Sequence, residues 1–439
     1  MVYQSDSQLS IFPISTSLDG GGSLTIAGHS LRQLAGVYGT PLYAYDGETV
    51  RHQVQVLKTA FSHSYRGEAL IAYASKAYLS LGIARKLSAL GIGVDVVSLG
   101  EIKFAQKGGF DGGSVHLHGN NKSEAELQAA LDWDIQAIVV DNLDELSLLE
   151  ELAARSGKKA RIWLRITPDL EVNTHPHIET SHSGSKFGLH ISNGQAAEAI
   201  RRARSSRWLR LTGLHMHLGS QLFDPEPYRL AIQKLYALAA EQQFIPEELS
   251  PGGGWGVRYT TDDPCDDSQP WVDAISRTVH DECDSRGWPV PRLVIEPGRH
   301  LVARAGVAIY RVGTQKDTPD GTHIVALDGG MADNPRVALY NSQYTALVVD
   351  RPLASDKLKS RVVGKFCESG DVLIPEIDLP HVSRSDFLAI PVAGAYQLSM
   401  SSNYNFATRP CVLWLEPGRV EVLQEREHPD QCQWWGGCA

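Results

Sequence analysis

Short apolar runs alternate with amphipathic segments between about residues 68 and 300. The runs are rich in β-branched and other apolar residues, which is typical of buried strands, and the segments between them, such as 123–133 and 142–157, repeat apolar residues at spacings of three and four, which predicts helices. Strands that alternate with helices form parallel sheets. The pattern therefore predicts a (β/α)8 barrel, with a doubly wound open sheet as the alternative. The eight predicted strands are 69–74, 93–98, 114–119, 137–141, 161–166, 211–218, 248–254 and 292–297.

The pattern changes after Arg299. Short strands such as 371–376 then follow at close intervals between turn residues, and the helical period almost disappears, which predicts a β domain, either a barrel or a sandwich. Residues 23–46 also have the pattern of strands with one short helix, so we expect the N-terminal segment to join this domain. The predicted division is a (β/α)8 barrel over 48–300 and a β domain formed by 1–47 and 301–439.

Length and composition fit this two-domain interpretation. The chain has 439 residues, more than one hydrophobic core usually organises. It is 42% hydrophobic and 21% charged, and no apolar run approaches the roughly 20 residues of a membrane span, so no membrane partner is expected. The formal net charge of -10 argues against a nucleic-acid partner, because such proteins concentrate lysine and arginine on one face.

The N-terminus and the cysteines predict a cytoplasmic protein. The first 15 residues lack the charged and apolar regions of a secretory signal. The cysteines are scattered over a long chain without CxxC spacing, which favours reduced thiols over a disulfide framework. They are Cys265, Cys283, Cys367, Cys411, Cys432 and Cys438.

Polar residues follow the predicted strands at the end where a (β/α)8 barrel carries its active site. A lysine amine can form a Schiff base with an aldehyde, and it reacts more readily if dry surroundings lower its pKa. A glycine-rich turn lets backbone N–H groups approach a phosphate, and a carboxylate can keep a pyridine nitrogen protonated. Together they predict pyridoxal 5'-phosphate as the cofactor. The residues at these strand ends are Lys76, Asp95, Ser98, His118, Arg165, His217, Gly252, Gly253, Gly254 and Glu296.

Simpler interpretations exist for the same residues. Lys76 alone is a solvated lysine at a strand end, the glycines form an ordinary turn, and "EPGR" ends a strand with a surface salt bridge. His215 and His217 point the same way along a strand and could ligate zinc, but a third ligand is missing, so no metal is expected. The histidine-rich segment 174–184 has the character of a loop, which argues against a metal site there.

Nine motifs carry a resemblance to a known family. They are "YASKA", "HGNNKS", "HPHIETSHSGSKFG", "HMHLGSQ", "GGGWG", "EPGRHLV", "DGGMADNPRVALY", "CESGDVL" and "GAYQLSMSSNYN". Over roughly residues 35–415 the chain resembles the fold type III pyridoxal-phosphate decarboxylases, and among them those that act on diaminopimelate.

The resemblance implies a role for each matching residue. Lys76 binds the cofactor aldehyde, His217 stacks on the cofactor ring, and Glu296 pairs with the ring nitrogen. Arg299, Arg336 and Tyr340 hold the substrate carboxylate that is not lost, a task that suits the planar fork of arginine. The segment 174–184 lies near the pocket and acts as a lid. The residues expected around the phosphate are Ser220, Gly252, Gly253, Gly254, Gly298 and Tyr396, and Arg299 and Tyr396 are expected to contact both cofactor and substrate.

The "CESGD" segment is expected in the β domain. As a bare sequence, Cys367 has the pattern of a buried small hydrophobe. The resemblance instead implies that Cys367 donates a proton and that Glu368 contacts the distal substrate amine, both inserted into the barrel of a neighbouring subunit. An obligate homodimer with two shared sites is therefore expected.

The implied activity is decarboxylation of meso-2,6-diaminopimelate to L-lysine and CO2, the last step of lysine biosynthesis. One alternative is a related decarboxylase that acts on ornithine, arginine or carboxynorspermidine, but Arg336 and Tyr340 suit a second carboxylate rather than an amine tail. The other is a non-catalytic regulatory homologue, against which the presence of Lys76 and Cys367 counts.

Overall fold

A computed structural model describes residues 8–170 and 184–431. The chain divides into two compact units. The barrel unit comprises Gln53–Gly256 and Asp266–His300, and the β unit comprises Met1–His52, Val257–Cys265 and Leu301–Ala439. The segment Val257–Cys265 lies inside the range predicted for the barrel but belongs to the β unit. In the part of the chain that is described, no helix has the length and apolar character needed to cross a membrane.

Eight parallel strands form a closed barrel in the first unit. Each strand pairs with the next along the chain, including β8 with β9, and the ring closes where the last strand pairs with the first. The (β/α)8 prediction is confirmed, and the open-sheet alternative is wrong. The short β10 (Leu189–His190) adds to β9 outside the ring. The barrel strands are β5 (Ala69–Ala74), β6 (Gly93–Val96), β7 (Val115–Leu117), β8 (Ala137–Val140), β9 (Ala160–Thr167), β11 (Leu209–His215), β12 (Glu248–Gly252) and β13 (Arg292–Ile295).

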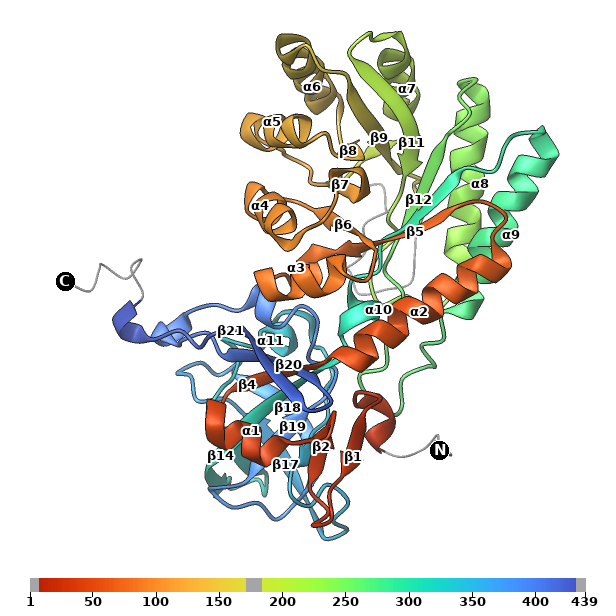
Figure 1. Cartoon of the computed structure of the whole chain (residues 1–439). Helices are drawn as coiled ribbons and strands as arrows, with labels where there is room; N and C mark the ends of the chain where they lie inside the picture. The colour runs from red at the N-terminus through yellow and green to blue at the C-terminus, as the bar shows by residue number, and fades with distance from the viewer. Residues whose placement is uncertain (1–7, 171–183, 432–439) are drawn as a thin grey trace. The chain divides into compact units, whose positions relative to one another are not determined.

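Helices α3 to α9 lie outside the barrel strands (Figure 1). Several begin at a side chain that accepts a hydrogen bond from the first turn, as Ser98 and Asn142 do, and Ser123 forms a reciprocal capping box with Glu126. These caps explain why the helices start directly after the polar strand ends. The helices are α2 (Gly47–Ser64), α3 (Leu81–Ser88), α4 (Leu99–Gly108), α5 (Glu124–Trp133), α6 (Leu143–Ser156), α7 (Gln195–Ser205), α8 (Glu226–Glu241), α9 (Gln269–Arg286) and α10 (Arg299–Val302).

Trp163 on β9 fills part of the barrel interior. It is fully buried, stacks on His116 with 4.5 Å between ring centroids, and donates its indole N–H to Glu248 Oε2 at 2.8 Å. Gln136 donates to the other oxygen of Glu248 at 2.7 Å. A Cβ at Gly213 would lie 2.7 Å from the Trp163 ring, so only glycine leaves room for the indole here. The packed and hydrogen-bonded interior supports the strand ends that carry the site.

The β unit contains a mixed sheet in which the N-terminal strand is central. Strand β4 (Leu42–Asp46) pairs antiparallel with β14 (Gly306–Asp317) and parallel with β20 (Cys411–Glu416). The expectation that the N-terminal segment joins the C-terminal β domain is confirmed. The other strands of this sheet are β15 (His323–Leu327), β16 (Leu347–Val348), β17 (Lys357–Val363), β18 (Val372–Pro380), β19 (Phe387–Ile390) and β21 (Arg419–Gln424).

The β unit also contains a small three-stranded sheet and two short helices. The small sheet is antiparallel, and helix α1 follows it directly. The elements are β1 (Thr16–Leu18), β2 (Leu24–Ile26), β3 (His29–Ser30), α1 (Leu31–Tyr38) and α11 (Arg336–Tyr340).

Candidate active site

Lys76 lies just after β5, in the short 3-10 helix η2 (Ser75–Ala77). The other two residues of this helix are buried, whereas the Lys76 side chain is exposed. Its charge acts on the buried Asp95 and His215 and on the half-buried His217, all at neighbouring strand ends. The expected dry surroundings are not found, because the lysine stands on a turn beyond the strand, but the amine does lie near the buried polar residues of the barrel.

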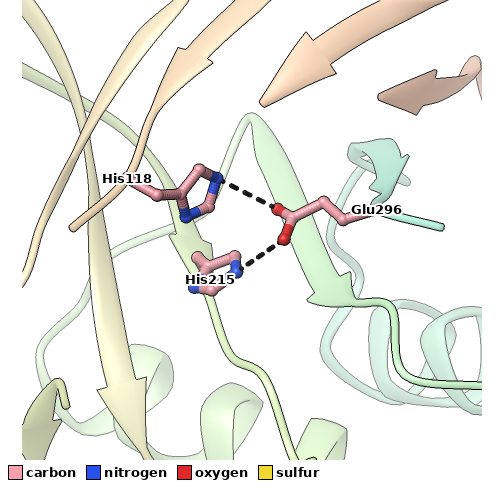
Figure 2. A group of neighbouring side chains, drawn as sticks. All are labelled: His118, His215 and Glu296. Carbon is pink, nitrogen blue, oxygen red and sulfur yellow. Dashed lines mark hydrogen bonds and ion pairs between the residues drawn. The ribbon is translucent and has the colours of Figure 1, made fainter. Parts of the chain in front are cut away.

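A buried carboxylate forms the centre of the barrel site. Glu296 directly follows β13 and is 8% exposed. Its Oε2 lies 3.0 Å from His215 Nε2, and its Oε1 accepts a hydrogen bond from the Ser250 hydroxyl at 2.6 Å. The Nε2 of His118 lies 3.6 Å from Oε1. Figure 2 shows both imidazoles directed at the carboxylate.

The protonation of His215 follows from its surroundings. Burial lowers the pKa of His215 far below its usual value, and the nearby cations Arg165 and Lys76 lower it further, so the imidazole is neutral. A carboxylate oxygen accepts hydrogen bonds, so the neutral His215 tautomer with N–H at Nε2 is the one that donates a hydrogen bond to Glu296. The Nδ1 of His215 is buried and has no partner among the described residues. His215 and Ser250 together fix the orientation of the Glu296 carboxylate.

The other histidines of the site are also neutral. Burial lowers the pKa of His118 and of His217 well below the usual value, and it lowers the pKa of His116 to about 3. Burial also raises the pKa of Asp95 well above its usual value, and the charge of Glu296 adds to this effect. The Oδ1 of Asp95 lies 3.3 Å from His116 Nδ1. The barrel interior therefore disfavours any charge that lacks a partner.

The glycine turn after β12 brings backbone atoms close together. The φ angles of Gly252 and Gly254 are 77° and 101°, a conformation that glycine adopts readily. A Cβ at Gly253 would collide with the carbonyl oxygen of Glu296, and one at Gly254 would collide with that of Gly219. Within the described chain, the N–H groups of Gly253 and Gly254 donate to no protein acceptor. Free N–H groups at a tight turn suit an anion.

Gly298 and Arg299 follow Glu296, whose backbone packs against the glycine turn. Arg299 is 7% exposed, and its Nη2 donates to the hydroxyl of Ser220 at 3.0 Å. Gly298 packs against the segment that carries the site lysine, because a Cβ there would lie 3.1 Å from the Cβ atoms of Ala74 and Ala77. The "EPGR" segment is therefore buried, and its interpretation as a surface salt bridge is wrong.

Arg336 is a buried arginine of the β unit that is surrounded by tyrosine rings. It begins α11 and is 6% exposed, and its guanidinium carbon lies 5.5 Å from the ring centroid of Tyr259 and 5.7 Å from those of Tyr340 and Tyr396. Burial alone would lower the pKa of Arg336, but neighbouring phenolic groups, Tyr259 first, outweigh it and raise the pKa above its usual value. Its Nη2 donates to Ser342 at 3.1 Å, while its buried Nε has no partner among the described residues.

Cys367 and Glu368 occupy the loop between β17 and β18, and both are exposed. The backbone N–H of Cys367 donates to the side-chain oxygen of Asn405 at 3.3 Å. The interpretation of Cys367 as a buried hydrophobe is wrong, because the buried cysteines of the described chain are Cys283 and Cys411. A thiol and a carboxylate are thus presented at the surface of the β unit.

The predicted site residues fall into two sets. The barrel unit carries Lys76, His217, Ser220, Gly252, Gly253, Gly254, Glu296, Gly298 and Arg299, and the β unit carries Arg336, Tyr340, Cys367, Glu368 and Tyr396. The zinc alternative paired His215 with His217, but the structure groups His215 with His118 and Glu296, whose possible ligand atoms lie within 4.8 Å of one another. Most of the predicted lid segment, including His175, His177 and His182, lies outside the described residues.

Comparison with known proteins gives the family. Residues 48–303 match the family described as "Pyridoxal-dependent decarboxylase, pyridoxal binding domain". A diaminopimelate decarboxylase of Bacillus subtilis (strain 168) is 43% identical over 92% of this chain and 93% of its own length, and one of Bacillus methanolicus is 41% identical over 94% and 96%. A crystal structure of diaminopimelate decarboxylase from M. jannaschii in co-complex with L-lysine has a TM-score of 0.89 and 33% identity, covering 95% of this chain and 96% of that one. The chain belongs to the pyridoxal-dependent decarboxylase family.

A pyridoxal-dependent decarboxylase uses pyridoxal 5'-phosphate, and the described barrel residues fit this group. The free N–H groups of Gly253 and Gly254 suit the phosphate. The Glu296 carboxylate has about four lone-pair sites, of which His215 and Ser250 use two, so it can accept a further N–H. These features are in the barrel unit, in agreement with the range of the family match.

Sequence reasoning missed several residues of this decarboxylase site. The sequence pattern does not point to Ser250, and it indicates His215 only as a zinc ligand. The available signals were weak: His215 shares a strand face with His217, and Ser250 lies two residues before the glycine turn. Tyr259 belongs to no motif and Asn405 only ends the motif "GAYQLSMSSNYN", and the folded structure brings them to Arg336 and Cys367.

The hydrogen bond from His215 to Glu296 can be tested with two substitutions. His215→Leu removes the donor at similar volume, and we expect it to weaken binding of pyridoxal 5'-phosphate to the apoenzyme about tenfold or more, because a hydrogen bond to a charged group contributes ~1.5–3 kcal/mol. His215→Gln supplies an amide donor and is expected to retain most of the affinity. The Kd is measured by fluorescence titration, with His63→Leu on the exposed face of α2 as the control. Equal affinity of the Leu variant and the unaltered protein contradicts the account.

His116 predicts a dependence of stability on pH. Its pKa is about 3 in the folded protein and close to its usual value when unfolded, so below about pH 6.5 the unfolded chain binds a proton that the folded chain does not. Stability is therefore lost as the pH falls from about 6.5 towards 3, at up to ~1.4 kcal/mol per pH unit from this group. His116→Phe keeps a ring against Trp163. It should reduce the slope of the unfolding free energy against pH by the amount that corresponds to about one proton, as measured by urea unfolding at several pH values. An unchanged slope contradicts this prediction.

Proposed function

We propose that the protein decarboxylates meso-2,6-diaminopimelate to L-lysine and CO2. Three observations support this function: relatives that are 41% and 43% identical are diaminopimelate decarboxylases, a similar solved structure holds L-lysine, and the chain keeps Lys76 and Cys367. The observation that carries the substrate assignment is Arg336. It is a buried cation with an unused Nε donor, surrounded by aromatic rings.

Arg336 distinguishes diaminopimelate from amino acids with an amine tail. Diaminopimelate has a second α-carboxylate that remains after CO2 is lost, and it needs a cation at that end. Ornithine and arginine end in a positive group, which a buried guanidinium would repel. Tyr340, on the same helix and 5.7 Å from the guanidinium carbon, is proposed to assist in holding this carboxylate together with Tyr396.

The barrel residues are proposed to bind the cofactor and to orient it. Pyridoxal 5'-phosphate supplies an electron sink for the pair released when the carboxylate leaves. Lys76 is proposed to hold the cofactor aldehyde. Glu296 is proposed to hold a proton at the ring nitrogen, because His215 and Ser250 fix the orientation of its carboxylate. His217, neutral and half-buried, is proposed to stack on the ring. Arg299 is proposed to contact the cofactor and the retained substrate carboxylate. The proposed phosphate contacts are Ser220, Gly252, Gly253, Gly254, Gly298 and Tyr396.

The β-unit loop completes the reaction. When the bond between the α-carbon and the carboxylate breaks, CO2 leaves and the carbon gains a proton. We assign this proton to Cys367 Sγ, which is then reprotonated by solvent, and we assign contact with the distal amine to Glu368. Both residues are exposed on a short loop, as a group that acts on another molecule requires. Loss of the thiol should slow the protonation step rather than cofactor binding.

The proposed assembly is a homodimer with two shared sites. Each site would combine the barrel residues of one subunit with Cys367 and Glu368 of the other, so that neither subunit is active alone. The proposed functional domains are the cofactor-binding barrel over 48–300 and the β domain of 1–47 and 301–439. We further propose a cytoplasmic enzyme without nucleic-acid or membrane partners, in keeping with its scattered cysteines and a formal charge of -10.

Substrate choice is tested by measuring CO2 release from meso-diaminopimelate, ornithine and arginine separately. We expect release from diaminopimelate alone, and a loss of about 100-fold in kcat/KM in Arg336→Gln, because truncating one partner of a buried charge pair costs ~2–5 kcal/mol. Arg361→Gln, at an exposed position of β17, is the control. Faster release from ornithine or arginine identifies a related decarboxylase, and no release from any substrate identifies a non-catalytic homologue.

Shared sites are tested by co-expressing Lys76→Ala and Cys367→Ala subunits, each inactive by itself. Random pairing makes half of the dimers mixed, and each mixed dimer has one intact site, so about one quarter of the normal activity should return. Each variant expressed alone is the matched control. Activity that stays at background in the verified mixed dimer contradicts a site built from two subunits.

A further inference from the structure

Asp371 lies at the base of the loop that carries Cys367. It directly precedes β18, is 3% exposed, and uses both carboxylate oxygens. Its Oδ1 accepts the backbone N–H of Met331 at 2.6 Å, and its Oδ2 accepts that of Phe366 at 2.7 Å. One side chain therefore joins two segments of backbone that are distant in the sequence.

Two glycines make room for this carboxylate. A Cβ at either Gly330 or Gly364 would collide with the Asp371 carboxylate. Neither glycine has a positive φ, so the requirement is for space rather than for an unusual backbone conformation. Backbone hydrogen bonds add to this joint between 329–331, 364–366 and Asp371, because Lys365 N donates to Gly329 O at 3.2 Å and Gly364 N donates to Asp371 O at 2.9 Å. The segments 329–331 and 364–366 thus pack against one buried anion.

Each of the two segments leads to a residue of the proposed chemistry. The first continues from Met331 to Arg336 at the start of α11, and the second continues from Phe366 directly to Cys367 and Glu368. The loop tip itself is exposed from residue 367 to 370. An exposed loop with few ties samples many conformations unless its base is fixed.

We propose that Asp371 is a positioning residue that locks the Cys367–Glu368 loop to the Gly329–Met331 turn. It holds in place both the loop with the proton donor and the turn that leads to Arg336. The roles of Cys367 and Arg336 in this statement rest on the proposed function, whereas the joint itself rests on the contacts of Asp371. Burial raises the pKa of Asp371, and the two backbone donors act against this by favouring the ionised form.

The test compares Asp371→Asn and Asp371→Ala with Asp378→Asn, which removes the same charge at an exposed position of the same strand. In the holoenzyme we expect amide hydrogen exchange to rise about tenfold or more in peptides that cover 329–333 and 364–370, and not elsewhere. The Met331 and Phe366 N–H groups both lose their acceptor in Asp371→Ala, and one of them loses it in Asp371→Asn, where the amide keeps a single oxygen. Bound cofactor should be unchanged. The kcat should fall about tenfold, with a larger solvent deuterium isotope effect, since proton delivery becomes limiting.

A double substitution separates positioning from general damage. Gly364→Ala should reproduce the loss in kcat by pushing against the carboxylate, without removing it. Combining it with Asp371→Ala opens the space, so the double variant should be no slower than Asp371→Ala alone, a non-additive result expected only for residues in contact. Gly364→Ala also serves if an Asp371 variant fails to fold.

Three outcomes overturn the proposal. They are unchanged exchange and kcat in both Asp371 variants, faster exchange spread over the whole β unit, and additive losses in the double variant. The outcome is separable from that of the proposed function. Absence of CO2 release from diaminopimelate by the unaltered enzyme would remove the function, whereas local hydrogen exchange judges the Asp371 joint in either case.

Discussion

A carboxylate buried at the carboxyl end of a barrel strand is the constraint on which this structure depends. Glu296 is almost inaccessible to water, and a buried charge is costly unless polar groups surround it. The barrel supplies the Ser250 hydroxyl and the His215 imidazole, each to a different oxygen. Because burial keeps His215 neutral, it donates a hydrogen bond without adding a positive charge that would neutralise Glu296. The carboxylate therefore remains an oriented acceptor.

The same principle applies in the β unit at a different position. There the buried carboxylate is Asp371, and its partners are backbone N–H groups rather than side chains. Glu296 fixes an acceptor where chemistry on the cofactor is proposed, whereas Asp371 fixes backbone that carries a thiol and leads to a guanidinium. In both cases nearby glycines are required by packing, Gly253 against the Glu296 carbonyl and Gly364 against the Asp371 carboxylate.

The fold and half of the site follow from periodicity in the sequence. The alternation of apolar runs and amphipathic segments predicts the barrel, and the carboxyl ends of parallel strands meet at one end, which is why Lys76, His217 and Glu296 could be found as strand-end residues. The strand-like pattern of residues 23–46 likewise predicts that the N-terminal segment joins the β domain, and the structure shows how, by pairing β4 with β14 and β20.

The rest depends on contacts that a linear pattern does not contain. The exposure of Lys76 reflects a short turn beyond β5, and the exposure of Cys367 reflects a loop whose position is set by its base. Ser250 meets Glu296 because of the register between β12 and β13. Asp371 meets Met331 across 40 residues of chain. Residues of these types occur throughout the sequence, and only the folded backbone selects the ones that matter.

The most direct test of the central claim is the 15N chemical shift of the ring nitrogen in enzyme reconstituted with 15N-labelled pyridoxal 5'-phosphate. If Glu296 is the oriented acceptor described above, the nitrogen should have the shift of a protonated pyridine at neutral pH, and Glu296→Gln should give the shift of an unprotonated ring. An unprotonated nitrogen in the unaltered enzyme, or the same protonated shift after Glu296→Gln, would contradict the account.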